Sequence, residues 1–120
     1  MPIIDVELIA LDAPKNLKNL TQNLTNSAAI ILNSPNGQTW LKLHFLPLNQ
    51  YAENGGVPED FKSLFVSLLL KNNLSEDKRS EIAFKLCESF STITHFPKDH
   101  IHILFLPEGS GRMVFGGSFG

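Results

Sequence analysis

Proline follows the initiator methionine in this chain, and that position gives its nitrogen a chemistry that an internal proline lacks. A small second residue permits removal of Met1, which leaves Pro2 with a free secondary amine. Such an amine is a stronger base than a primary amine, and its ring fixes its direction. Apolar burial and nearby cations lower the pKa of an amine toward neutral pH, where a general base works best. Pro2 is therefore our first candidate for a catalytic group, as a base that moves protons between oxygen and carbon.

Such a base needs positive charge nearby to hold an acidic substrate and to stabilise a developing enolate. Three side chains are candidates for substrate binding: Lys42 and His102, at matching places in two predicted strands, and Arg112, in a glycine-rich turn near the C-terminus. His102 would bind a carboxylate only when protonated. Each has a simpler alternative. Lys42 pairs with Asp5 or Glu7 on the same face, His102 hydrogen-bonds within a subunit interface, and Arg112 is an ordinary surface arginine.

The composition excludes several classes of protein. The chain has 120 residues and a formal net charge of −2, which predicts one domain, 1–120, without the basic surplus that nucleic-acid binding needs. No apolar run reaches the ~18 residues of a membrane span, so we expect no membrane partner. The single cysteine, Cys87, and the lack of a signal peptide predict a cytoplasmic location. His100 and His102 could ligate zinc, but no third ligand is evident and we predict no metal site.

The sequence is similar to itself. Residues 41–47 read LKLHFLP and residues 101–107 read IHILFLP. Upstream, apolar positions match at a near-constant offset of 62 residues: Leu20, Leu24, Ala28 and Ile31 correspond to Ile82, Leu86, Phe90 and Ile93. The order of these matches predicts an internal duplication within the domain, with a first unit at 2–60 and a second at 61–120.

The first unit is predicted to form a strand, a helix and a strand. Apolar and acidic residues alternate over 3–9, which is typical of a strand. Asp12 precedes Pro14 and is the expected N-cap of a helix, because proline is favoured in the first helical turn. Apolar residues at helical spacing follow, and the cluster NSPNG at 33–37 ends the helix. Residues 38–46 form the second strand.

The second unit repeats this order. A strand lies within 61–71, and Ser75 caps a helix that runs to about Thr94. The last long strand covers 100–106. Residues 112–115 are predicted to form a short strand at the C-terminus.

Two such units side by side predict the overall architecture. One crossover makes the strands of each unit parallel, so the fold is α+β, with a four-stranded mixed sheet and both helices on one face. The opposite face bears Trp40, Leu69 and Leu104, and no element of the chain covers it. Because parallel strands are rarely open to water on one side, we expect other subunits to bury this face.

The start Met-Pro-Ile-Ile, the duplicated units of about sixty residues and the Gly-Gly pair at 116–117 together resemble the tautomerase superfamily. In that superfamily, 4-oxalocrotonate tautomerase has one unit per chain and macrophage migration inhibitory factor has two fused units. The resemblance implies a homotrimer with pockets at subunit boundaries, a free Pro2 amine, and neither a metal nor an organic cofactor. His102 takes the place of a substrate-binding arginine of the single-unit enzyme.

The chain departs from the pattern of that family at several positions. Asp12 stands where the single-unit enzyme has another arginine, and Leu74 stands at the matching place of the second unit. Leu64 replaces the proline that would begin the second unit, so each subunit offers at most one catalytic amine.

The resemblance predicts an isomerase of the tautomerase type that interconverts keto and enol forms, or double-bond isomers, of a small 2-oxo acid. The partner is then a small-molecule carboxylate substrate. Two alternatives stay open: a decarboxylase or hydratase that uses the same amine, and a non-catalytic trimeric binding module.

Overall fold

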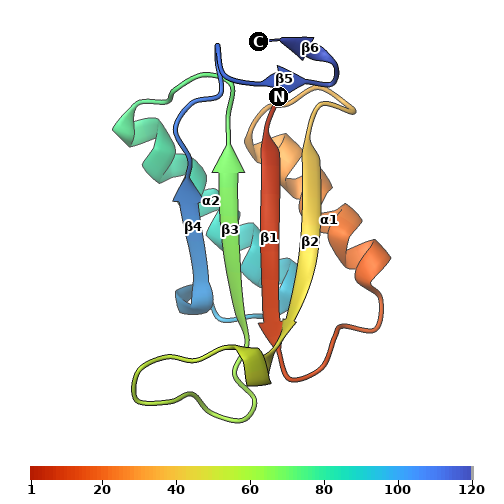
Figure 1. The fold of residues 1–120 in the computed structure, drawn as a ribbon, viewed down its shortest axis with the longest axis vertical. Helices are drawn as coiled ribbons and strands as arrows, with labels where there is room; N and C mark the ends of the chain where they lie inside the picture. Colours follow the sequence, from red (N-terminus) through yellow and green to blue (C-terminus); the bar gives the residue numbers. More distant parts are fainter. Residues whose placement is uncertain (120) are drawn as a thin grey trace.

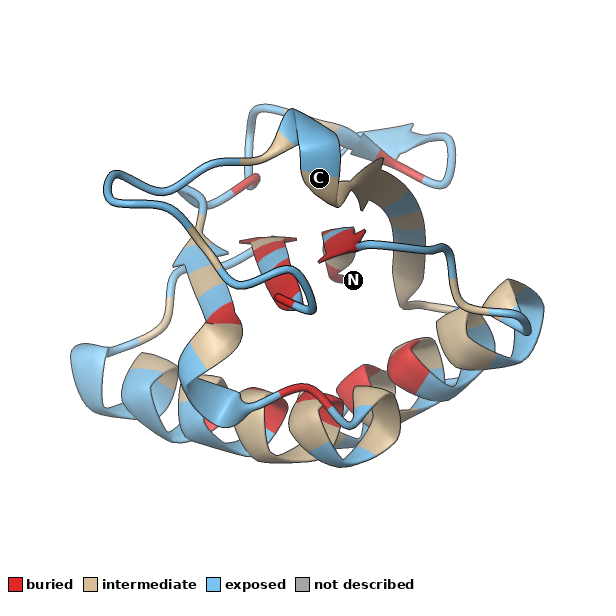
Figure 2. Cartoon of the chain, turned by 90° about the horizontal axis from the view of Figure 1, so that it is seen from below, coloured by how far each residue is buried: buried red, intermediate tan, exposed pale blue. Residues whose placement is uncertain are grey.

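The computed structural model describes residues 1–119 and has a four-stranded sheet in the order β2-β1-β3-β4 (Figure 1). Neighbouring strands β1 and β2 are parallel, as are β3 and β4, whereas the central strands β1 and β3 are antiparallel. Both helices lie on one side of this mixed sheet (Figure 2). The predicted α+β fold is confirmed. The elements are β1 (Ile3–Ala10), α1 (Leu17–Ile31), β2 (Trp40–Pro47), β3 (Ser63–Leu69), α2 (Glu76–Thr94) and β4 (Ile101–Phe105).

The core lies between the sheet and the helices, because alternate strand residues share a face. Ile4, Val6 and Leu8 of β1 are fully buried there. They pack with a cluster that includes Leu24 of α1 and Phe90 of α2. Burial of each such side chain stabilises the fold by roughly 1.5–3 kcal/mol. This packing fixes β1, and with it the segment that precedes β1.

The first helix begins later than its sequence predicts. Asp12 and Pro14 lie in the connection before α1, and Asn16 is the N-cap, with its side-chain oxygen accepting a hydrogen bond from the Asn19 N–H at 3.4 Å. The prediction of Asp12 as N-cap was wrong. Proline disfavours helical geometry in the residue before it, so Ala13 cannot readily continue a turn started at Asp12.

The second helix begins at its predicted cap. The Ser75 hydroxyl accepts a hydrogen bond from the Lys78 N–H at 3.2 Å. We expect Ser75→Ala to lower the free energy of unfolding by about 1 kcal/mol, because that N–H loses its partner. Ser80→Ala, on an exposed position of the same helix, is the matched control and should cause no loss. Urea unfolding of both variants measures the difference, and equal stabilities would contradict the cap.

The C-terminal segment forms a hairpin where a single short strand was predicted at 112–115. Strand β5 (Val114–Phe115) pairs antiparallel with β6 (Ser118–Phe119). Gly116 and Gly117 form the two-residue turn with φ of 57° and 85°, and a tight hairpin turn of this kind requires such left-handed residues. The hairpin packs against the start of β2, where the Phe115 and Trp40 rings are 6.4 Å apart between centroids.

The sheet face away from the helices is open in the single chain. Phe65 and Leu104 lie on it with 39% and 58% of their surface exposed. Within residues 1–119, neither helix combines the length and the apolar character needed to cross a bilayer.

Candidate active site

Pro2 is held at the end of the sheet, immediately before β1. It is buried, whereas Met1 is 42% exposed. The Pro2 carbonyl accepts a hydrogen bond from the Trp40 N–H at 3.1 Å, so the ladder between β1 and β2 extends to this residue. On the other side, Ile3 lies opposite Leu69 of β3. The ring nitrogen of Pro2 thus has a fixed place between two strands.

The C-terminal segment closes around the same end of the sheet. The Gly109 N–H donates to the Leu70 carbonyl and the Ser110 N–H donates to the Lys71 carbonyl, both at 2.8 Å. These bonds tie the loop that carries Arg112 to the chain just after β3. Figure 1 shows the N-terminus beside β5. The Pro2 end of the sheet thus also carries the hairpin, whose Phe115 ring stacks with Trp40, and the loop that holds Arg112.

Lys71 is a cation of this site that the sequence analysis missed. It follows β3 by two residues, and the last residue of β3, Leu69, lies opposite Ile3 of β1. Burial lowers the pKa of the Met1 ammonium, and the positive charge of Lys71 lowers it further. The signal that could have found Lys71 is the pairing of the two central strands.

The three predicted substrate-binding residues occupy different places. Arg112 is exposed in the loop tied to the Pro2 end of the sheet. Lys42 lies opposite Asp5 and forms an ion pair with it at 3.4 Å, as the simpler alternative described. At a strand rise of about 3.3 Å per residue, Lys42 is roughly 10 Å along the sheet from Pro2.

His102 lies further away within one chain. It is opposite Phe65 of β3, which itself lies opposite Glu7 of β1. Glu7 is five residues from Pro2 along β1, or roughly 16 Å in the strand direction. In addition, β4 is two strands away from β1 in the sheet. The His102 and Phe65 rings are 4.6 Å apart between centroids. A single chain thus brings Arg112 and Lys71 to the Pro2 end, has Lys42 further along, and leaves His102 apart.

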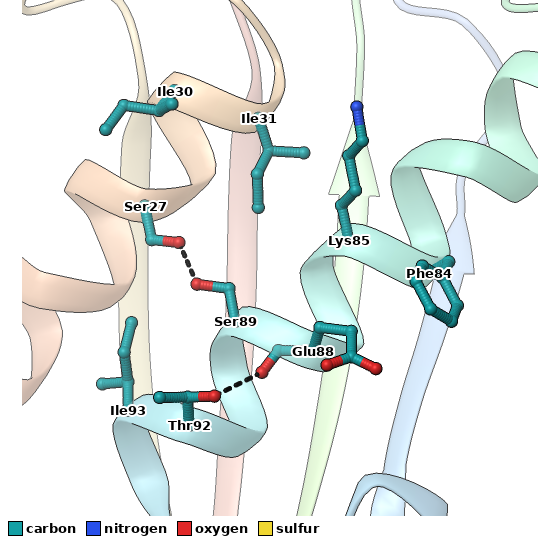
Figure 3. A pocket seen from close by; sticks show the side chains of 9 residues that line it. All are labelled: Ser27, Ile30, Ile31, Phe84, Lys85, Glu88, Ser89, Thr92 and Ile93. Carbon is teal, nitrogen blue, oxygen red and sulfur yellow. Dashed lines mark hydrogen bonds between the residues drawn. The ribbon is translucent and has the colours of Figure 1, made fainter.

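A concave region lies on the outer face of the helices, away from Pro2. It has a volume of about 630 Å³ and lies between α1 and α2 (Figure 3). Its lining is mainly aliphatic and aromatic, from Ile30, Ile31, Phe84 and Ile93, and it contains the hydrogen bond between Ser27 and Ser89. The ionic residues there are already paired, Lys85 with Glu81 and Glu88 with Lys98. We assign this hollow no part in the chemistry of Pro2.

No family model and no curated protein matches this chain. Solved structures do match it over nearly the whole length. A structure of Pt0534 inactivated by 2-oxo-3-pentynoate is 15% identical, with a TM-score of 0.80 over 98% of this chain and 94% of that chain. A fused 4-OT wild-type symmetric trimer is 11% identical, with a TM-score of 0.80 and the same coverage.

A macrophage migration inhibitory factor homologue from Prochlorococcus marinus is 20% identical, with a TM-score of 0.68 over 98% of this chain and 99% of that chain. At these sequence identities, the structural similarity establishes the fold and no more. The resemblance predicted from the sequence is confirmed at that level: the chain has the α+β fold of the tautomerase superfamily.

Proposed function

We propose that this protein is a tautomerase that interconverts the keto and enol forms, or double-bond isomers, of a small 2-oxo acid. The amine of Pro2 is the general base. The observation that carries this proposal is the position of Pro2, which is buried immediately before β1, next to an N-terminal ammonium whose pKa is lowered by burial and by the charge of Lys71. Both influences lower an amine pKa toward neutral pH, where the neutral form of the base is available.

The reaction needs only proton transfers. The neutral amine takes a proton from the carbon next to the keto group, which gives an ammonium and an enolate. The ammonium then returns the proton to the enolate oxygen, or to a different carbon in the case of a double-bond shift. Positive charge stabilises the enolate and binds the substrate carboxylate. We assign this role to Arg112 and Lys42 from the elements near Pro2, and to His102 from a neighbouring subunit.

Assembly into a homotrimer is part of the proposal. The open sheet face is the surface that we expect other subunits to cover, because parallel strand pairs are rarely exposed on one side. The fused 4-OT of the same fold is a symmetric trimer. Pt0534, also of this fold, is inactivated by a 2-oxo acid, 2-oxo-3-pentynoate, which supports an acid of that class as the ligand here.

Two alternatives use the same architecture. The amine serves decarboxylation or hydration equally well where the substrate carries a suitable group. The second alternative is a trimeric binding module without catalysis. It is favoured by Asp12 and Leu74, which stand where the resemblance would place an arginine. The cytoplasmic location remains a prediction from the single cysteine.

Intact-mass measurement of the protein from its natural host tests the proposal first. We expect Met1 to be absent, because proline as the second residue permits its removal. The same preparation should accelerate ketonisation of phenylpyruvate or 2-hydroxymuconate above the rate in buffer. A retained Met1 would block the amine by a peptide bond and would overturn the proposed mechanism.

A further inference from the structure

A polar hollow lies between the C-terminal half of α1 and the connection that leads from α1 to β2. Its volume is about 790 Å³, and each residue of its lining is uncharged. The lysines of this edge of the molecule, Lys18 and Lys42, line the adjoining hollow between α1 and β2 instead. We call the uncharged region the amide hollow, because four exposed carboxamide side chains share its lining: Gln22, Asn26, Asn33 and Asn36.

Two hydroxyls in the lining of the amide hollow are buried without a partner. Ser34 Oγ and Thr39 Oγ1 are shielded from solvent, and neither has a hydrogen-bond partner among residues 1–119. An unpaired buried hydroxyl lowers the stability of a fold, and native proteins contain few of them. Rotation about χ1 between staggered wells changes the direction of such a hydroxyl. A ligand in the hollow that pairs with these hydroxyls would remove their cost.

The segment that carries the two hydroxyls is held in place by its own main chain. The Ser34 N–H donates to the Ala29 carbonyl at 2.9 Å, which ties the segment to the end of α1. The Gln38 N–H donates to the Pro35 carbonyl at 3.0 Å, which closes a turn just before β2. Because the segment is already ordered, a ligand that binds there loses little affinity to the ordering of the chain.

The hydrogen-bonding groups of the amide hollow fit a ligand with several hydroxyls. Carboxamides and hydroxyls both donate and accept hydrogen bonds, as the hydroxyls of a polyol do. Gln22 Nε2 donates to Asn26 Oδ1 at 2.8 Å, and this bond leaves the Gln22 oxygen and the Asn26 nitrogen for other partners. Ile30, with 80% of its surface exposed, and Pro35 supply apolar surface for C–H groups. A charged ligand would lose water here without gaining a counter-charge.

We propose that the amide hollow binds one ring of a neutral saccharide. The hydroxyls of the sugar pair with the carboxamides and with Ser34 and Thr39, and a C–H face of the ring lies against Ile30 and Pro35. This ligand differs in class from the acid proposed for Pro2. The inference therefore does not depend on the proposed function, and each can fail without the other.

The stability of the free protein tests whether the two hydroxyls are unpaired. We expect Ser34→Ala and Thr39→Val each to raise Tm by about 3 °C, because each removes a buried group that lacks a partner. Thr92→Val is the matched control on α2, where the Thr92 hydroxyl donates to the Glu88 carbonyl at 3.0 Å. Its Tm should not rise. Calorimetry measures the three values, and a lower Tm for both hollow variants would show that the hydroxyls are paired and would overturn the proposal.

Saturation-transfer NMR at millimolar ligand tests binding, with glucose, galactose, mannose, N-acetylglucosamine and N-acetylgalactosamine as probes. We expect transfer to at least one of these sugars, with shifts of backbone amide signals confined to residues 22–39. Ser34→Ala and Thr39→Val should each raise Kd about tenfold, since each removes a hydrogen-bonding group. Thr39→Ser keeps the hydroxyl and, like Thr92→Val, should bind as the wild type does.

Glucuronate tests the uncharged character of the site, because it differs from glucose by a carboxylate. We expect it to bind more weakly than the neutral sugars, and equal binding would contradict the assignment. Transfer to none of the five neutral sugars, or equal Kd values for the wild type and both hollow variants, would overturn the proposal. Pro2→Ala should bind sugar as the wild type does, so its catalytic result bears on the proposed function alone.

Discussion

Pro2→Ala is expected to lower kcat/KM for phenylpyruvate ketonisation by about 10²–10⁴-fold, the contribution of a well-placed general base. Alanine also permits removal of Met1, so the variant keeps a free N-terminal amine. That amine is primary, a weaker base, and free to rotate because it has no ring. The hydrogen bond from the Trp40 N–H ends on the main-chain carbonyl of residue 2, so the sheet keeps its ladder in the variant.

A matched control separates this effect from a general effect of proline removal. Pro14→Ala changes a half-buried proline in the connection before α1, beyond the opposite end of β1 from Pro2. Its activity should equal that of the wild type. Stopped-flow assays of ketonisation measure the activity of both variants, and far-ultraviolet circular dichroism checks that both are folded. Activity of Pro2→Ala within twofold of the wild type would contradict the role of the ring nitrogen.

The sheet and both helices were predictable because each follows from a periodic pattern within a short segment. Ile4, Val6 and Leu8 alternate with polar residues and are all fully buried. Leu24 and Ala28, four residues apart on one helical face, are likewise buried. These patterns depend on local geometry, with a period near two in a strand and 3.6 in a helix.

Details that depend on competition between neighbouring residues were less predictable. Asp12 and Asn16 are both good N-caps, and the conformational restriction imposed by Pro14 decided between them. At the C-terminus, Gly116 and Gly117 permit a tight hairpin turn. The sequence analysis used the pair only as part of the resemblance to the tautomerase superfamily and so missed the second strand of the hairpin.

The site was predicted only in part, because periodicity assigns a residue to a face and not to a level along the sheet. Lys42 and His102 were correctly placed on the open face, where both are exposed. Their distances from Pro2 follow from strand register, which joins segments far apart in the sequence. The charge of Lys71 lowers the pKa of the N-terminal ammonium, and no pattern around residue 71 indicates this relation between distant segments.

Leu104→Asp is expected to break the proposed trimer. Leu104 lies on the open face opposite Ser67, and 58% of its surface is exposed in the single chain. If other subunits cover this face, the new carboxylate becomes buried without a group of opposite charge to pair with. Such burial costs several kcal/mol per subunit, and each 1.4 kcal/mol is a tenfold loss in association. The molar mass in solution, measured by sedimentation velocity, should fall from trimer to monomer.

Phe84→Asp is the matched control, since Phe84 is 67% exposed on the outer side of α2. Both substitutions remove an exposed apolar side chain and add one negative charge. Leu104→Asp changes the open face of the sheet, whereas Phe84→Asp changes the helix layer, so only Leu104→Asp should dissociate the trimer. Activity should be lost together with assembly if a neighbouring subunit supplies His102 to the Pro2 pocket. A Leu104→Asp protein that stays trimeric would show that the open face around Leu104 is not the subunit interface. A monomeric wild type with full activity would show that one chain holds the complete site.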